Sequence, residues 1–287
     1  MTTRAQVSPR RTLRVGTFNV RNSAAVDGEW AWSNRRATLI DLVRANAPDL
    51  IGFQEVLPDQ QQHLAEDLAE YDSVATHRDD GVGYGEAASV FFKRDRFDKL
   101  DAGTFWLSPD SDRPGPAAWD AACPRICTWA VLHDKSAGRN VAVFNTHFDH
   151  EGDLARLESA ALVVRHLAAL EETAILMGDF NATEDSPVYV AVFDAARAAG
   201  RPLTDAHRAV HPMRTANEAS FHGFTAERLD APQSATAGLR IDWILHDDGL
   251  RAIDSRIGPA TDAAGRFASD HAPVWAELHY TNERTVR

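Results

Sequence analysis

Cysteine is scarce in this sequence, and its scarcity removes several classes of site. Among 287 residues only Cys123 and Cys127 carry thiols, and they are separated as C-P-R-I-C. Two thiols cannot form a disulfide framework, and this spacing is neither C-x-x-C nor accompanied by a second pair. We therefore expect reduced, partly buried thiols with no zinc-binding or redox role.

Long apolar runs are absent as well. No segment approaches the roughly 20 apolar residues that span a bilayer, so the sequence does not predict an integral membrane protein. The first residues, MTTRAQVSPRRTLRV, lack the apolar core and the small-residue cleavage site of a signal peptide. We expect residues 1–12 to form a flexible arm and the protein to be cytoplasmic.

Positive charge is in deficit. The chain has 42 acidic residues against 30 lysines and arginines, which gives a formal charge of -12 at pH 7. Such a surface repels a polyanion and disfavours avid nonspecific binding to DNA. Because a local basic patch can still attract phosphate, nucleic acid remains a candidate partner, ranked below a small phosphorylated substrate.

Strand-length apolar runs alternate along the chain with helical patterns. The runs cover residues 13–20, 49–56, 88–93, 140–148, 174–180, 240–246 and 273–278. Between several of them apolar residues return every three or four positions, which predicts helices at 33–47, 59–68 and 154–170. No linker cluster divides the chain, and the stretch SPDSDRPGP at 108–116 is typical of a long surface loop. We predict one α/β domain over residues 13–280, followed by a tail at 281–287.

Polar side chains stand where these strands begin or end. The stretch AILMGDFN places Asp179 and Asn181 at the end of a buried strand, and because alternate residues point the same way, both would face one cleft. Further such positions are Asn19, Glu55, His147, Asp242, Asp270 and His271. Any one of them is typical of a turn or a structural hydrogen bond. Together they would supply carboxylates for a hard divalent cation, two imidazoles, and amides that orient a ligand.

The motifs around these positions carry a resemblance to a known family. TFNV, GFQEV, NTHFDH, GDFN, IDWIL and SDHAP follow one another between residues 17 and 273. In this order they resemble the endonuclease/exonuclease/phosphatase superfamily, which includes DNase I-like nucleases, sphingomyelinases, inositol phosphatases and deadenylases. The resemblance implies a four-layered α/β sandwich, with two central, mostly antiparallel β-sheets flanked by helices. It also implies phosphoester hydrolysis assisted by magnesium or manganese.

The resemblance identifies metal-binding positions. Glu55 matches the family's metal-binding glutamate, while Asn19 and Asp270 match residues near the same ion. A shell with few carboxylates, completed by water and substrate phosphate, suits Mg²⁺. The implied cofactor is therefore Mg²⁺ or Mn²⁺, which would neutralise phosphoryl oxygens and stabilise the leaving oxygen.

The resemblance also identifies catalytic positions. His271 matches the histidine that contacts the scissile phosphate, and Asp242 matches the aspartate that orients it. A carboxylate beside an imidazole fixes its tautomer and favours its charged form. Asp179 would align or deprotonate the attacking water, and Asn181 would donate a hydrogen bond to phosphate.

Three further residues complete the expected site. His147 matches the second histidine of the DNase I-like branch, and Glu86, in GYGEAASVFF, is its expected partner. Arg125, in CPRICTWA, occupies a place where relatives carry a phosphate-binding arginine, with a surface salt bridge as the alternative interpretation. Glu86 and Arg125 are thus the expected substrate-binding residues.

Three longer segments narrow the resemblance to one branch. GTFWLS, WDAACPRICTWA and NTHFDHEGDLARLESA resemble a bacterial group of small, single-domain metal-dependent hydrolases. Where relatives often have an aromatic residue after the glutamate of the GE pair, this chain has Ala87, which would widen the pocket. We expect in-line attack of water on a phosphate ester of a small soluble metabolite, with a DNA or RNA nuclease as the alternative.

Two other functions compete with a phosphoesterase. The stretch THFDHEG resembles the H-x-H-x-D-H motif of metallo-β-lactamase-like zinc hydrolases, but Asn145 stands where that motif has its first histidine. The second alternative is a non-catalytic binding module on the same scaffold. We disfavour it because the acid, imidazole and amide positions are all filled, and fold alone does not decide function.

Overall fold

The computed structural model describes residues 11–215, 218–225 and 239–281 of the chain. The expected arm falls mostly outside these ranges, although Thr12 already belongs to the first strand, β1 (Thr12–Asn19). Most of the expected tail, 282–287, also lies outside them. In the described part of the chain, no helix is both long enough and apolar enough to cross a membrane. The cytoplasmic location stays a prediction.

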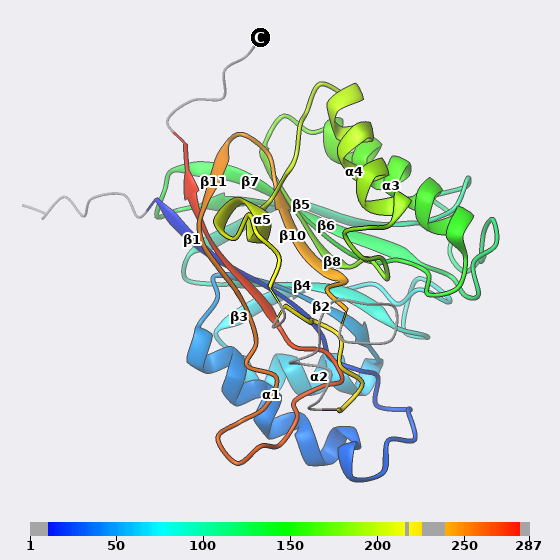
Figure 1. The fold of residues 1–287 in the computed structure, drawn as a ribbon, viewed down its shortest axis with the longest axis vertical. Helices are drawn as coiled ribbons and strands as arrows, with labels where there is room; N and C mark the ends of the chain where they lie inside the picture. The colour runs from blue at the N-terminus through cyan, green and yellow to red at the C-terminus, as the bar shows by residue number, and fades with distance from the viewer. Residues whose placement is uncertain (1–10, 216–217, 226–238, 282–287) are drawn as a thin grey trace, which may run out of the picture.

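Two six-stranded sheets form the centre of the molecule (Figure 1). The first has the order β11 (Leu250–Ile257), β12 (Val274–Tyr280), β1, β2 (Leu50–Val56), β4 (Ala87–Lys93), β3 (Tyr71–Val74). The second has the order β5 (Phe97–Trp106), β6 (Ile126–Asp134), β7 (Arg139–His147), β8 (Thr173–Asp179), β10 (Asp242–His246), β9 (Thr204–Asp205). Each sheet contains one parallel pair, β1 with β2 and β7 with β8, and its other pairs are antiparallel.

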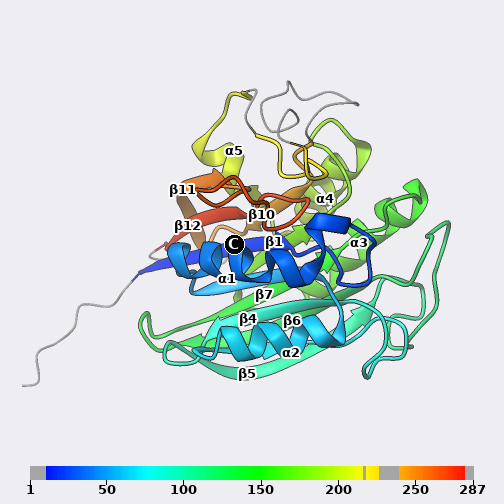
Figure 2. The ribbon, with the colours of Figure 1, turned by 90° about the horizontal axis from the view of Figure 1, so that it is seen from below.

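Helices cover the outer faces of both sheets (Figure 2). α1 (Trp32–Asn46) and α2 (Pro58–Asp67) pack on the first sheet, and α3 (Asp153–Ala168) and α4 (Pro187–Ala198) pack on the second. The short helices η1 (Gly28–Trp30) and α5 (Ala206–Val210) lie in connections. This is the four-layered α/β sandwich that the resemblance implied, and the prediction is confirmed.

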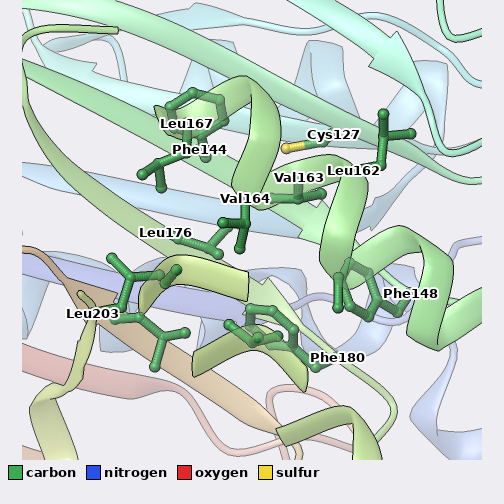
Figure 3. Packing of buried hydrophobic residues seen from close by; sticks show 14 of the residues in the cluster. Cys127, Phe144, Phe148, Leu162, Val163, Val164, Leu167, Leu176, Phe180 and Leu203 are labelled. Carbon is green, nitrogen blue, oxygen red and sulfur yellow. The ribbon is translucent and has the colours of Figure 1, made fainter. Parts of the chain in front are cut away.

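Three apolar layers hold the sandwich together. Between the sheets, strands of both contribute buried side chains such as Val15, Val143 and Met177. A second layer joins α3 and α4 to the second sheet, where Phe144 and Leu176 meet helix residues (Figure 3). A third joins α1 and α2 to the first sheet. Because β1, β2, β7 and β8 are covered on both faces, most of their residues are buried and each strand contains an apolar stretch.

The predicted helices are all present, with ends shifted by a residue or two. The sequence prediction missed α4, which begins with a recognisable cap: the Ser186 hydroxyl accepts a hydrogen bond from the Tyr189 amide, and Pro187 occupies the first turn. It also missed strands β3, β5, β6, β9 and β11. The expected loop at 108–116 is confirmed as turns and bends.

Candidate active site

The site lies at the carboxyl ends of the two parallel strand pairs. Asn19 ends β1 and Glu55 lies near the end of β2, while His147 and Asp179 end β7 and β8 side by side in register. Asp242 opens the antiparallel strand β10 directly opposite Asp179. The helical crossovers force both strands of each parallel pair to run in the same direction. Polar residues that are distant in sequence therefore meet at one edge of the sandwich.

A bulge in β2 turns Glu55 into the cleft. The register of β2 with β4 shifts between Phe53 and Val56, and Glu55 has a φ of 61°. A left-handed conformation at a residue other than glycine is strained, and such residues cluster at functional sites. Alternation along β2 points Gln54 inward between the sheets, where it is fully buried. The bulge interrupts this alternation at Glu55.

A buried amide bridge joins the two sheets beneath the site. Asn145 Nδ2 donates to the carbonyl oxygens of Phe53 (2.9 Å) and Ser89 (2.8 Å), and Asn145 Oδ1 accepts from Gln54 Nε2 (2.6 Å). A Cβ at Gly52 would come within 2.6 Å of the Asn145 side chain, so this approach requires glycine. Both polar atoms of the Asn145 side chain are therefore used in hydrogen bonds that join the sheets. Asn145 does not act as a metal ligand, which argues against the lactamase-like alternative.

Asn19 connects the expected metal-binding and catalytic groups. Its Nδ2 donates to Glu55 Oε1 (2.9 Å) and to Asp179 Oδ2 (3.0 Å). The other Glu55 oxygen accepts from the backbone and side-chain nitrogens of Asn22, both at 3.0 Å. Burial raises the pKa of Glu55, but the hydrogen bond from Asn19 and the charge of His271 outweigh it and leave that pKa below its usual value. Glu55 is thus held as an anion.

Asp179 lies at the centre of the site. Burial raises its pKa to about 7, and the neighbouring Asp242 carboxylate adds to the rise. Its Oδ2 lies 3.4 Å from His147 Nε2 and 3.7 Å from His271 Nε2. Its Oδ1 accepts a hydrogen bond from the backbone nitrogen of Asn181 at 2.9 Å. A carboxylate with a pKa near neutrality is suited to exchange a proton at physiological pH.

The two histidines have opposite protonation tendencies. His271 Nδ1 lies 2.9 Å from Asp242 Oδ2, and although burial opposes it, this carboxylate raises the pKa of His271 to about 10. Burial lowers the pKa of His147 well below its usual value, and the positive charges of Arg125 and Arg78 lower it further. One imidazole is therefore cationic and the other neutral at pH 7.

The side-chain amide of Asn181 fixes the orientation of His147. Asn181 Nδ2 donates both to His147 Nε2 and to the Phe148 carbonyl, each at 3.0 Å, which makes His147 Nε2 an acceptor. Asn181 has a φ of 46°, a second left-handed residue in the site. Since both contacts use its amide nitrogen, donation to a phosphate would have to replace one of them.

The predicted pairing of Glu86 with His147 is corrected. The hydrogen bonds of Glu86 go instead to Arg78 Nη1 (2.6 Å) and Asn22 Nδ2 (3.3 Å). The reason is local: Arg78 and Glu86 come together where the loop between β3 and β4 closes, with the Arg78 amide donating to the Glu86 carbonyl at 3.0 Å. Burial raises the pKa of Glu86.

Arg125 is a buried residue and not a surface ion pair. It is 6% exposed, its Nε lies 3.4 Å from Asp149 Oδ2, and its Nη2 lies 2.9 Å from His150 Nδ1.

A second group of possible ligand atoms lies beside Arg125: those of Cys123, Asp149 and His150 are within 4.8 Å of one another. The Arg125 guanidinium already occupies their neighbourhood with positive charge, which fits the expectation that Cys123 binds no zinc.

These residues surround a cleft of about 540 Å³. Of the predicted residues, those that line it are Glu55, Glu86, Arg125, His147, Asp179, Asn181, Asp270 and His271. Asn19 and Asp242 are 0% and 1% exposed and support the lining from behind. Lining residues that the sequence analysis missed are Arg21, Asn22, Arg78, Cys123, His150, Thr183, Phe221, Leu239 and Ile241. The available signals were the nearness of Arg21 and Asn22 to the TFNV motif and the positions of His150 and Ile241 within NTHFDH and IDWIL.

The donors in the cleft fit a hard divalent cation. Burial raises the pKa of Asp270, and the negative charge of Glu55 raises it further, so two carboxylates face the same space. Arg21 Nε lies 3.7 Å from Asp270 Oδ2 and balances part of this charge. The oxygen donors of these two carboxylates are the ligand type of Mg²⁺ and Mn²⁺.

Comparisons with known proteins agree with the fold. The sequence pattern of the Endonuclease/Exonuclease/phosphatase family matches residues 16–271, and the chain belongs to this family. Members of the family are phosphoester hydrolases that generally use divalent metals.

Two solved structures are similar over nearly their whole length. The endonuclease/exonuclease/phosphatase of Bacteroides vulgatus is 34% identical, with 94% of this chain and 99% of that chain covered and a TM-score of 0.84. A mannosyl-6-phosphatase of Bacteroides thetaiotaomicron is 32% identical, with 93% and 100% covered and a TM-score of 0.79. An uncharacterized protein of Acanthamoeba polyphaga mimivirus is 29% identical over 127 residues, or 42% of this chain and 47% of that protein. The match thus spans about half of that relative.

Proposed function

We propose that the protein is a Mg²⁺- or Mn²⁺-dependent phosphoesterase that hydrolyses a small soluble phosphorylated metabolite. The observation that carries this proposal is the position of Asp179. Its Oδ2 lies within 3.7 Å of a cationic and a neutral imidazole and 3.0 Å from an amide that also holds Glu55. A proton acceptor, a phosphate-stabilising cation and a carboxylate suited to a metal thus occupy one cleft.

The proposed catalytic residues differ in protonation state, and their roles differ accordingly. Asp179, whose pKa is about 7, aligns the attacking water and accepts its proton at neutral pH. His271 is held in its charged form by Asp242 and stabilises negative charge on the phosphoryl group. His147 and Asn181 orient the phosphate from the other side of Asp179.

Glu55, Asp270 and Asn19 are the residues that would hold the metal ion. A bound divalent cation neutralises phosphoryl oxygens and stabilises the leaving oxygen. The carboxylates of Glu55 and Asp270 provide the negative charge, and Asn19 keeps Glu55 in position through its 2.9 Å hydrogen bond.

Three features favour a small substrate. The cleft has a volume of about 540 Å³, which suits a molecule of metabolite size. The chain's charge of -12 opposes a polyanion. A relative that is 32% identical over nearly its whole length is a mannosyl-6-phosphatase, which acts on a small sugar phosphate. The apolar lining residues Phe221, Leu239 and Ile241 provide a surface for the organic part of such a molecule.

A metal titration tests the proposal. Purified protein is treated with chelator, and magnesium or manganese is added back with a generic phosphomonoester and a generic phosphodiester as reporters. We expect activity to require added metal and Glu55→Gln to weaken both turnover and metal binding, the latter measured by calorimetry. Full activity in chelator would refute metal dependence, and activation by zinc alone would refute the choice of Mg²⁺ or Mn²⁺.

A nuclease of the same family is the second candidate. A substrate screen separates it from the first, with single-stranded DNA, duplex DNA, RNA, nucleotides, sugar phosphates, inositol phosphates and phospholipids assayed in the presence of manganese. Efficient cleavage of a polynucleotide, without comparable turnover of small phosphoesters, would reverse the ranking.

A further inference from the structure

Two arginines on the His147 side of the cleft have buried donors with no hydrogen-bond acceptor among the described residues. Arg78 Nη1 binds Glu86, whereas the buried Nε of Arg78 makes no hydrogen bond to a described residue and has only Asp79 Oδ1 nearby, at 3.6 Å. Arg125 directs Nε to Asp149 and Nη2 to His150, while its buried Nη1 has no acceptor either. Buried donors are almost always paired, so unused guanidinium donors beside a cleft indicate a ligand that accepts their hydrogen bonds.

Both guanidinium groups act on the same region. Arg78 and Arg125 line the cleft together with His147 and Glu86. Their charges lower the pKa of His147, and both act to lower that of Glu86, so neither is screened from the middle of the cleft. The third lining arginine, Arg21, is already engaged by Asp27 at 3.0 Å and by Asp270.

Arg78 is held in place before any ligand binds. Its backbone nitrogen donates to the Glu86 carbonyl (3.0 Å), and its carbonyl accepts from Trp106 Nε1 (2.6 Å). Its partner Glu86 accepts from Asn22, which also donates to Glu55 at 3.0 Å. Arg78 is therefore tied through Glu86 and Asn22 to the expected metal-binding carboxylate.

We propose that Arg78 and Arg125 bind the non-bridging oxygens of a terminal phosphate, and that Arg78 thereby selects phosphomonoesters over phosphodiesters. This inference rests on the proposed function and names its substrate class. A monoester presents three non-bridging oxygens and nearly two negative charges, whereas a diester presents two oxygens and one charge. The planar fork of arginine matches such oxygens in pairs, so two guanidinium groups gain most from the monoester.

The reaction balances as a hydrolysis. The oxygen of water forms a bond to phosphorus while the ester P–O bond breaks, and the alcohol leaves with a proton that came from the water. The products are inorganic phosphate and the free alcohol. Inorganic phosphate carries the same terminal oxygens as the substrate, so it is expected to bind the same two arginines as a competitive inhibitor.

Paired substrates with one leaving group test the inference. We compare kcat/KM for para-nitrophenyl phosphate and for bis(para-nitrophenyl) phosphate at a fixed manganese concentration. Arg78→Gln is expected to lower the monoester value by at least about 10-fold, because a hydrogen bond to a charged group is lost, and to change the diester value far less. Arg94→Gln is the matched control, since Arg94 is exposed and pairs with Asp72 away from the cleft.

A second variant controls for a loss of activity that is caused by misfolding. Arg78→Gln leaves Glu86 without its ion pair, so the double variant Arg78→Gln/Glu86→Gln removes both charges and should show the same loss of monoester preference. Binding of inorganic phosphate, measured by calorimetry, should weaken in both variants and not in Arg94→Gln. An unchanged ratio of monoester to diester activity in both cleft variants would overturn the inference while leaving the phosphoesterase standing. A wild-type protein that hydrolyses neither reporter would instead refute the proposed function.

Discussion

Two buried polar clusters lie at opposite ends of strands β1 and β2, and they differ in how completely they are paired. At one end is the Arg96 cluster, made of Arg96, Asp49 and Asp134. Arg96 Nε and Nη2 bind Asp134 at 3.0 and 2.7 Å, and its Nη1 binds Asp49 at 2.7 Å and the Thr12 carbonyl at 3.0 Å. At the other end lies the cleft with Asp179.

The Arg96 cluster links the two sheets. Asp49 and Thr12 belong to the first sheet's side of the sandwich, and Asp134 ends β6 in the second sheet. Both carboxylates are 0% exposed, and each has the same guanidinium as its partner. A charge pair of this kind, with its hydrogen bonds satisfied, stabilises one arrangement of the sheets.

The cleft keeps groups that are not satisfied. Asp242 Oδ1, Arg78 Nε and Arg125 Nη1 are buried without hydrogen-bond partners, and Asp179 has a strongly raised pKa. The comparison teaches that burial of charge does not by itself mark a functional site in this fold. Unused donors, shifted pKa values and left-handed residues such as Glu55 and Asn181 distinguish the cleft from the structural cluster.

The largest expected effect on stability is at the Arg96 cluster. Arg96→Met leaves the buried Asp134 without its ion-pair partner and Asp49 with Lys93, at 3.5 Å, as its cationic neighbour, and should lower the free energy of unfolding by about 3–5 kcal/mol. Activity per folded molecule should not change. Urea unfolding measures the first quantity, and Arg94→Met, which breaks an exposed pair with Asp72, is the control with a loss of about 1 kcal/mol at most. A loss as small as the control's would mean that the cluster is not a structural link.

Asp179→Asn should show the reverse pattern. Turnover is expected to fall by at least ~10²-fold, about 2.7 kcal/mol, because a positioned proton acceptor is removed. The melting temperature should stay close to that of the wild type, since the variant replaces a carboxylate that is destabilised by burial. Steady-state kinetics and thermal unfolding are the measurements, and near wild-type turnover would show that the site is misplaced.

The pH dependence of stability should reveal the cleft and not the Arg96 cluster. Although burial opposes it, Asp242 raises the pKa of His271 to about 10, above the ~6.5 of an unfolded histidine. The resulting stability is complete below pH ~6.5 and is lost as the pH rises through 10. Thermal unfolding of chelator-treated protein should therefore show a falling melting temperature over this window. Asp242→Asn should flatten the fall, and an unchanged slope in that variant would contradict the assignment.

The smallest expected effect is that of salt on catalysis. A protein that neutralises six or more DNA phosphates loses roughly 10³-fold in affinity between 50 and 200 mM salt. A small substrate held by Arg78, Arg125 and the histidines should lose far less over the same range, because few charges are involved. The measurement is KM for the best small substrate as a function of potassium chloride. A steep slope, together with polynucleotide cleavage, would favour the nuclease.

The sequence was most informative where strands are buried on both faces. The runs that became β1, β2, β7 and β8 are mostly buried, have apolar residues at their centres and carry polar residues at or next to their carboxyl ends, so both the strands and these polar residues could be predicted. Strand β5, FDKLDAGTFW, was missed because its middle is exposed and charged. Its place in the sheet comes from pairing with β6, which no local pattern encodes.

In the cleft, too, some features follow from the sequence and others only from the tertiary structure. By itself the sequence determined which groups stand at the carboxyl ends of the parallel strands, because covalent order puts Asn19, Glu55, His147 and Asp179 there. The bulge that turns Glu55 into the cleft belongs to the tertiary structure. Only the tertiary structure decided that Glu86 binds Arg78 instead of His147, and that Asn22 joins Glu86 to Glu55. These partners depend on how one loop closes and on how two connections approach each other across the cleft. The Asn22 contacts join segments distant in the chain, and the Arg78–Glu86 pair depends on the conformation of the loop between β3 and β4, so no periodic sequence pattern specifies them.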